Sequence, residues 1–400
     1  MNQQPFGKPP RWWSPKPNYR WMQLWRPLRR YQQLRRERIT EISVQGLDFV
    51  RQAIAQGHGI LITPNHPGHG DCYLLWEALI RLRRPCYVMT AWQVFDAAKP
   101  FERLVYRQHG CFSVNREGND LQAFRQAVRV LQETSSPLVI FPEGEVYHLN
   151  ERVTPFREGT AAIVLSAIKR SGRPVTCIPC ALKYQYVSDP TPELTKVMDA
   201  LEERLYWRPR SDQPLADRIY RVAEGILRLK ELEYLGTANP APLPERIQLL
   251  ADEILKRLEK VYGARTPRAS IPQRVKDLRQ QAIARRNALA ADDNEQQRIE
   301  QHLDDLFFVV QLFSYPGDYV AERPTIERMA ETIDKFEEDF LDVPTARVRG
   351  TRRGLVTFGQ PIVVTASGNR QSARALTQTL EHRVQSLLND SEWVADRLSA

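Results

Sequence analysis

Short apolar runs and amphipathic segments alternate from residue 42 to residue 182 of this 400-residue chain. Short apolar runs are typical of buried strands, and apolar positions three and four residues apart are typical of helices. The expected strands are 59–64, 85–90, 111–114, 138–141 and 175–182. The expected helices are 46–56, 72–82, 98–108, 119–134 and 158–170. The alternation predicts an α/β fold with a mostly parallel or mixed sheet flanked by helices.

A large helical insertion is expected to interrupt this domain. Residues 188–345 are mostly charged, helix-forming stretches that proline and glycine separate. A strand-like stretch at 355–364 and a last helix at about 371–389 return to the earlier pattern. The predicted parts are an arm at 1–40, an α/β domain at 41–187 plus 346–400, and a helical insertion at 188–345.

The composition favours a cytoplasmic globular protein. No stretch approaches the roughly 18 apolar residues that a membrane-spanning helix needs, and the N-terminus lacks the pattern of a secretory signal. The five cysteines are few and scattered, which argues against a disulfide framework. Cys177 and Cys180 have the spacing of a redox or metal-binding pair, but their apolar neighbours favour a buried position.

The excess positive charge lies in the first 40 residues. They contain ten Lys or Arg and one acidic residue, so they carry a charge of +9, equal to that of the whole chain. Prolines predict an extended first half outside the core, and apolar spacing predicts a helix from about residue 20 to residue 38. Tryptophans beside cations suit a helix that lies on anionic lipid, here the inner face of the cell membrane. The membrane-binding candidates are Trp12, Trp13, Trp21, Trp25, Arg29 and Arg30.

Two other interpretations of this arm stay open. A solvated or partner-docking arm would have a similar composition, and nucleic-acid binding uses the same residue types. We favour the phospholipid surface and expect no nucleic-acid partner.

A histidine and an aspartate follow the strand at 59–64. Residues 65–71 read Asn-His-Pro-Gly-His-Gly-Asp, and the turn between His66 and Asp71 can bring the carboxylate to the imidazole. A carboxylate in that position fixes the tautomer of the ring, which then serves as a general base. The pair alone is weak evidence, because a histidine after a strand is more often a loop residue.

Other candidate residues follow other predicted strands. Phe141-Pro142-Glu143-Gly144 follows 138–141, and Arg116 follows 111–114. The ends of parallel strands are where ligands bind in α/β sheets, and a guanidinium can clamp a phosphate there. The candidates for substrate binding are Arg116, Glu143, Gly144 and Arg157.

In this order and at these spacings, the motifs resemble those of the glycerolipid acyltransferase family, which includes the lysophosphatidate acyltransferases. Asn65-His66 with Asp71 resembles the first block of the family, and Phe-Ser-Val-Asn-Arg at 112–116 resembles the second. Phe-Pro-Glu-Gly at 141–144 is similar to the third block, and Ile178-Pro179 to the fourth. The resemblance covers about residues 42–187.

The resemblance implies transfer of a fatty acyl group from acyl-CoA or an acyl carrier protein to a hydroxyl of a glycerol phosphate or lysophospholipid. His66 would take the hydroxyl proton, Asp71 would hold His66, and Arg116 would bind the acceptor phosphate, with Arg157 as a second cation. Glu143 and Gly144 would shape the acceptor site. The resemblance implies neither a cofactor nor a metal.

The sequence departs from the family pattern at three positions. Gly68 and Glu145 stand where the family usually has a small hydroxyl residue, and Asn115 stands where Asp is common. The carboxylate of Glu145 would disfavour a dianionic phosphate beside it, which leaves the acceptor headgroup open, a cationic or zwitterionic one included. The alternatives are a metal-dependent hydrolase that uses His66, His69 and Asp71, near His148, and an inactive membrane-bound scaffold.

Overall fold

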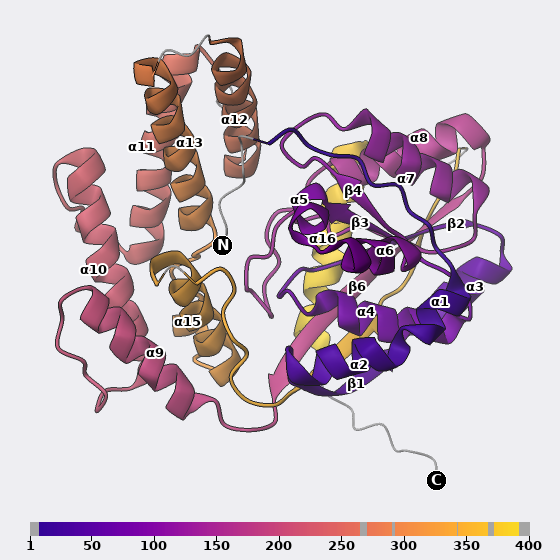
Figure 1. Cartoon of the computed structure of the whole chain (residues 1–400), viewed down its shortest axis with the longest axis horizontal. Coiled ribbons are helices and arrows are strands. Elements are labelled where there is room, and N and C mark those ends of the chain that lie inside the picture. The colour runs from indigo at the N-terminus through magenta and orange to yellow at the C-terminus, as the bar shows by residue number, and fades with distance from the viewer. Residues whose placement is uncertain (1–7, 265–269, 290–292, 342, 367–371, 392–400) are drawn as a thin grey trace. The chain divides into compact units, whose positions relative to one another are not determined.

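The computed structural model describes residues 8–264, 270–289, 293–341, 343–366 and 372–391. It contains two compact units (Figure 1). An α/β unit comprises Pro9–Asp189 and the chain from Arg347 onward, and a helical unit comprises Pro190–Ala346.

An eight-stranded mixed sheet forms the centre of the α/β unit, in the order β1-β7-β6-β2-β5-β3-β4, with β8 paired to β6. Strand β6 is antiparallel to β7 and β8, and every other neighbouring pair is parallel. The α/β fold class predicted from the sequence is therefore confirmed. The strands are β1 (Ile39–Gln45), β2 (Gly59–Pro64), β3 (Tyr87–Ala91), β4 (Cys111–Val114), β5 (Leu138–Val139), β6 (Val175–Tyr186), β7 (Arg352–Phe358) and β8 (Ile362–Val364).

Helices cover both faces of this sheet. Successive side chains of a strand point to opposite faces, so Ile60 and Ile62 of β2 belong to one core cluster and Leu61 to the other. The first cluster includes residues of α3 and α4, and the second includes residues of α7, α8 and α16. Burial on both faces explains why the strands read as short, almost wholly apolar runs. The helices of the unit are α1 (Tyr19–Leu24), α2 (Arg26–Arg35), α3 (Leu47–Ala55), α4 (Asp71–Leu79), the short 3₁₀ helix η1 (Ile80–Leu82), α5 (Trp92–Ala97), α6 (Pro100–Gln108), α7 (Leu121–Glu133), α8 (Gly159–Ser171) and α16 (Ala373–Asp390).

Two strand assignments differ from the sequence prediction. Strand β1 was not expected, because only three of its seven residues, Ile39, Ile42 and Val44, are apolar and it adjoins the basic segment. The single strand expected at 355–364 is two strands, β7 and β8, which pair in succession with the same side of β6 and are separated by Gly359 to Pro361. Cys180 pairs with Phe358 and Cys177 with Ile362, so the chain has one extra residue between the two pairings and bulges there.

The first 40 residues do not form a separate arm in the described part, which corrects the sequence interpretation. Trp12 packs against Phe112, and the Trp13 ring stacks on Phe95 at 6.0 Å between centroids. The amide of Trp13 donates to the Ser113 hydroxyl at 2.7 Å, which joins this segment to β4. Trp12 and Trp13 are therefore partly buried against the two core clusters and do not form a free membrane anchor.

Arg29 is also misassigned as a membrane-binding residue. It is 7% exposed, and its Nη1 donates to the Met22 carbonyl and to Nε2 of His109, both at 2.6 Å. Met22 is fully buried. Helices α1 and α2 are thus fixed to α6 from within, and removal of residues 1–38 would expose core rather than detach an arm.

The helical unit contains its own apolar core and buried ion pairs. Arg218 contacts Glu202 at 2.9 Å and Arg246 contacts Glu231 at 2.8 Å, with all four side chains at most 3% exposed. Breaking such a pair leaves an unpaired buried charge, which makes the register of these helices specific. The helices are α9 (Thr191–Arg204), α10 (Leu215–Leu235), α11 (Leu243–Tyr262), α12 (Ile271–Ala288), α13 (Asp293–Phe313), α14 (Tyr319–Glu322) and α15 (Ile326–Phe340).

The buried His109 predicts a loss of stability in acid. Burial first, and the nearby Arg29 charge second, lower the pKa of His109 to about 4. The unfolded chain, with a pKa near 6.5, therefore binds the extra proton between pH 6.5 and pH 4, so stability falls as the pH falls through that window, by about 2–3 kcal/mol. Urea unfolding at pH 7 and pH 4.5 measures this difference in the free energy of unfolding. His109→Gln, which keeps an acceptor for Arg29, should flatten this dependence.

The exposed His382 supplies the control for this experiment. His382→Gln should keep the wild-type pH dependence. An unchanged slope in His109→Gln would mean that other groups cause the acid sensitivity.

Candidate active site

Three strand ends bring the candidate residues together. His66 follows β2, Arg116 follows β4 and Glu143 follows β5, and these strands end at the same edge of the sheet because they are parallel. The amide of His66 donates to Glu143 Oε1 at 2.8 Å, and Arg116 Nη1 donates to the Gly144 carbonyl at 2.5 Å. Residues far apart in the sequence thus form one site.

The imidazole of His66 is held by a buried carboxylate. Its Nδ1 lies 2.6 Å from Asp71 Oδ2, and its ring stacks on Phe141 at 4.0 Å between centroids. Asp71 is 0% exposed and begins α4, and the His66 side chain is 20% exposed. Nδ1 therefore donates its proton to Asp71, and Nε2 is the nitrogen that can accept another.

Asp71 has further donors that the sequence interpretation missed. The hydroxyl of Tyr184 donates to Asp71 Oδ1 at 2.6 Å, and the amide of Gly68 donates to Oδ2 at 3.2 Å. Burial first, and the Asp71 charge second, hold the pKa of Tyr184 well above its ordinary value, so the phenol stays protonated and donates. No local motif identifies Tyr184, because it is 113 residues from Asp71 in the sequence.

Two asparagines fasten these loops to β6, which extends beyond the end of β2. Asn65 pairs with both the amide and the carbonyl of Leu182, at 2.7 and 3.0 Å. Asn150 pairs in the same way with Tyr184, at 2.7 and 2.8 Å. Strand β2 pairs with β6 only as far as Cys180, so no strand in the described part of the chain covers this side of β6 beyond that residue. The side-chain amides pair with the backbone there instead, since buried backbone groups must be hydrogen-bonded. Asn65 thereby fixes the residue before His66, and Asn150 fixes the backbone of Tyr184.

Glu143 joins two loops of the site and is only 3% exposed. Its Oε1 accepts from the His66 amide, and its Oε2 accepts from the amide and the hydroxyl of Thr154 at 2.9 and 2.5 Å. Burial raises the pKa of Glu143, and these hydrogen bonds oppose the rise. Both oxygens thus accept hydrogen bonds from the protein itself, so Glu143 positions the His66 loop, and its expected part in shaping the acceptor site stays a prediction.

Two guanidinium groups flank Gly144. Its φ of +80° lies in the left-handed region, and a methyl group there would lie 2.5 Å from Arg157 Nε, so only glycine fits. Arg116 lies on the Gly144 carbonyl and 2.7 Å from the Glu145 carboxylate. Arg116 and Arg157 therefore both lie beside Gly144, in the motif that the sequence analysis identified as a candidate binding site.

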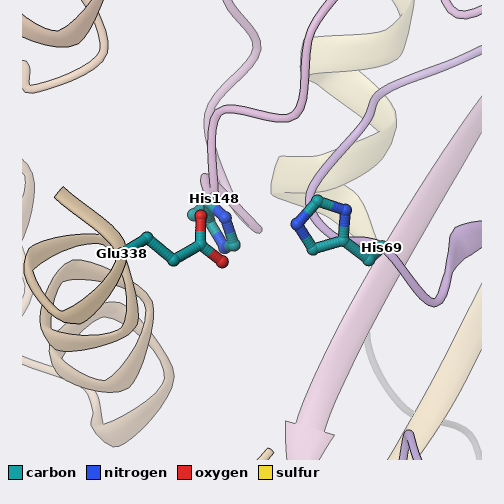
Figure 2. Close-up of side chains that lie close together, drawn as sticks. All are labelled: His69, His148 and Glu338. Carbon is teal, nitrogen blue, oxygen red and sulfur yellow. The ribbon is translucent and has the colours of Figure 1, made fainter. Parts of the chain in front are cut away.

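The histidines of the metal-dependent alternative do not form a ligand set with Asp71. Among the described residues, His66, His69 and Asp71 do not bring three ligand atoms within 4.8 Å of one another. The ring of His69 lies instead against that of His148, 5.5 Å between centroids and nearly perpendicular (Figure 2). Glu338, also labelled in that figure, belongs to α15 of the helical unit, where it accepts from the Ala346 amide.

Comparisons with known proteins agree with this geometry. Residues 41–183 match the acyltransferase family. The chain is also similar to glycerol-3-phosphate acyltransferase of Aeromonas hydrophila subsp. hydrophila, with 31% identity over 156 residues. Residues 41–183 therefore have the sequence pattern of an acyltransferase domain. The similar region covers 37% of this chain and 19% of the relative, so the chain spans about a fifth of the length of the curated relative it matches.

The acyltransferase match includes every sequence-predicted residue of the candidate site and ends one residue before Tyr184. Cys177 and Cys180 also lie within it, both fully buried in β6, as their apolar neighbours predicted. Burial raises the pKa of Cys177 to about 12, so this thiol is not a reactive thiolate at neutral pH.

Tyr184→Phe should lower the acyl-transfer kcat of this domain roughly tenfold, because Asp71 loses a strong hydrogen bond that fixes the His66 ring. The ring of Phe keeps the packing, but the buried Asp71 carboxylate loses a donor, so the unfolding midpoint should also fall. Steady-state kinetics and thermal unfolding measure the two effects.

Tyr73→Phe is the matched control, because the Tyr73 hydroxyl bonds Gln32 outside the site. Equal kcat values for Tyr184→Phe and the wild type would show that Tyr184 has no part in positioning Asp71.

Proposed function

We propose that this protein transfers a fatty acyl group from an acyl thioester to a hydroxyl of a glycerol phosphate or lysophospholipid. The observation that carries the proposal is the 2.6 Å contact between His66 Nδ1 and the buried Asp71 carboxylate, within an acyltransferase domain. The donor is acyl-CoA or an acyl carrier protein.

The reaction follows from the orientation of the ring. His66 Nε2 takes the proton of the acceptor hydroxyl as its oxygen attacks the thioester carbonyl. The tetrahedral intermediate collapses, the C–S bond breaks, and the proton passes from Nε2 to the leaving thiolate. Asp71 stabilises the imidazolium that exists between these events. The thioester is already activated, so the step requires no covalent intermediate on the protein.

His66→Ala should reduce kcat/KM for acyl transfer by at least about a hundredfold, because the base is lost. The assay follows labelled palmitoyl-CoA and a panel of lysophospholipids, with product identification. His382→Ala, at an exposed position of α16, should retain activity. Near-normal turnover in a folded His66→Ala protein would refute the general-base role.

We also propose that the protein binds a membrane surface through α1, α2 and α6. No helix in the described part of the chain is both long and apolar enough to cross a bilayer. Trp21 stacks with Trp25, and Trp25 meets Phe101 edge to face, which joins α1 to α6. Apolar side chains of these helices remain exposed, with Arg30, Arg35 and Arg36 exposed beside them. The exposed apolar side chains of this surface are Trp21, Leu24, Leu28, Tyr31, Phe101 and Leu104.

This combination favours anionic lipid. Exposed aromatic and aliphatic groups enter the headgroup boundary, and each nearby cation adds roughly 1 kcal/mol. Trp21 and Arg30 keep the role proposed from the sequence, Trp25 supports this surface by packing on Phe101, and Trp12, Trp13 and Arg29 are occupied within the fold.

Leu24→Glu should weaken flotation with phosphatidylglycerol vesicles at least about tenfold, since a carboxylate would enter the apolar boundary. Leu121→Glu is the matched control, because Leu24 and Leu121 are 60% and 62% exposed and Leu121 begins α7. Equal flotation of the two variants would refute this surface.

A further inference from the structure

We propose that the acceptor carries a phosphodiester with a single negative charge, as a lysophospholipid with a headgroup does, rather than a phosphomonoester. This inference rests on the proposed acyl transfer and narrows its acceptor class. It depends on the charges that the protein itself places beside the Gly144 bend.

The first of the two guanidinium groups is already neutralised. Arg116 Nη1 lies 2.7 Å from Glu145 Oε2, and the two side chains are 17% and 16% exposed. Burial alone would lower the pKa of Arg116, but the attraction of Glu145 and then of Glu117 outweighs it and raises the pKa, so Arg116 stays charged. The Glu145 carboxylate thus occupies a position on Arg116 that a phosphate oxygen would take.

The second guanidinium group, that of Arg157, has a nitrogen that remains available to a phosphate. Arg157 Nε is buried beside Gly144 and has no hydrogen-bond partner among the described residues. Arg157 interacts with Tyr147, whose pKa burial raises to about 12, so the phenol stays neutral. Glu143 directs both oxygens to donors of the protein. Arg116 and Arg157 with Glu145 supply one net positive charge, and the Glu117 carboxylate, which also attracts Arg116, lowers the positive potential further.

The charge of the acceptor follows from this balance. A phosphomonoester carries about 1.5 to 2 negative charges at pH 7, whereas a phosphodiester carries one. A diester matches the net charge of the three side chains, and the dianion would face the Glu145 carboxylate. Like charges placed together are strongly unfavourable in a partly buried site. A serine or threonine at position 145 would carry no charge to pair with Arg116, so both guanidinium groups would be available to the phosphate.

The test compares two acceptors that differ by one methyl group. They are 1-palmitoylglycerol 3-phosphate and its methyl phosphodiester, each assayed with labelled palmitoyl-CoA and the full chain. The wild-type kcat/KM should favour the diester at least about tenfold. Glu145→Gln and Glu145→Thr should each reduce or reverse this ratio, mainly through a lower KM for the monoester.

Glu133→Gln is the control, because Glu133 is an exposed residue of α7 that pairs with Arg129; its acceptor ratio should equal that of the wild type. A wild-type preference for the monoester, or a ratio unchanged in both Glu145 variants, would overturn the inference and leave acyl transfer standing. Transfer to neither acceptor nor to any lysophospholipid would overturn acyl transfer itself.

Discussion

The contact between the His66 imidazole and the Asp71 carboxylate is the interaction on which the rest of the site depends. A carboxylate with no exposed surface is stable only when donors surround it, and here the ring, the Tyr184 hydroxyl and the Gly68 amide do so. Two of these donors lie in the same turn as Asp71, but Tyr184 is 113 residues away, so the complete network forms only when the sheet has formed. The same burial that makes Asp71 costly therefore makes the orientation of His66 specific.

The sheet supplies the frame for this network. Parallel β2, β5, β3 and β4 direct their ends to one edge, and β6 continues beyond that edge to carry Tyr184. Asn65 and Asn150 hydrogen-bond the backbone of β6 where it extends beyond β2, and Glu143 joins the His66 loop to Thr154. Positioning groups thus outnumber the groups that would touch a substrate.

The sequence predicted what local pattern and short spacing determine. Strands at 59–64 and 111–114 were found with their bounds, because each is a short apolar run between helices. His66 and Asp71 lie in one turn, so their contact followed from spacing alone. Pairing across the sheet left no such signal, so β1, the β7–β8 break and Tyr184 were missed.

Residue composition alone predicted surfaces and binding partners poorly. Tryptophan and arginine near the N-terminus suggested an exposed arm, yet Trp13 stacks on Phe95 and Arg29 bonds His109. Both residue types also serve as long-range packing groups, and only coordinates separate the two uses. Glu143 gave a similar lesson, because the motif marks its importance without revealing that its oxygens face inward.

The most direct measurement of the central claim is the tautomer of His66, read from ¹⁵N and ¹H NMR of the imidazole nitrogens at neutral pH. Seven histidines make assignment practical, with His66→Asn as the reference. The account predicts a protonated Nδ1 whose proton is shifted far downfield by Asp71, and an unprotonated Nε2. A ring protonated at Nε2 and bare at Nδ1 would contradict it, because that ring could not accept the proton of an acceptor hydroxyl.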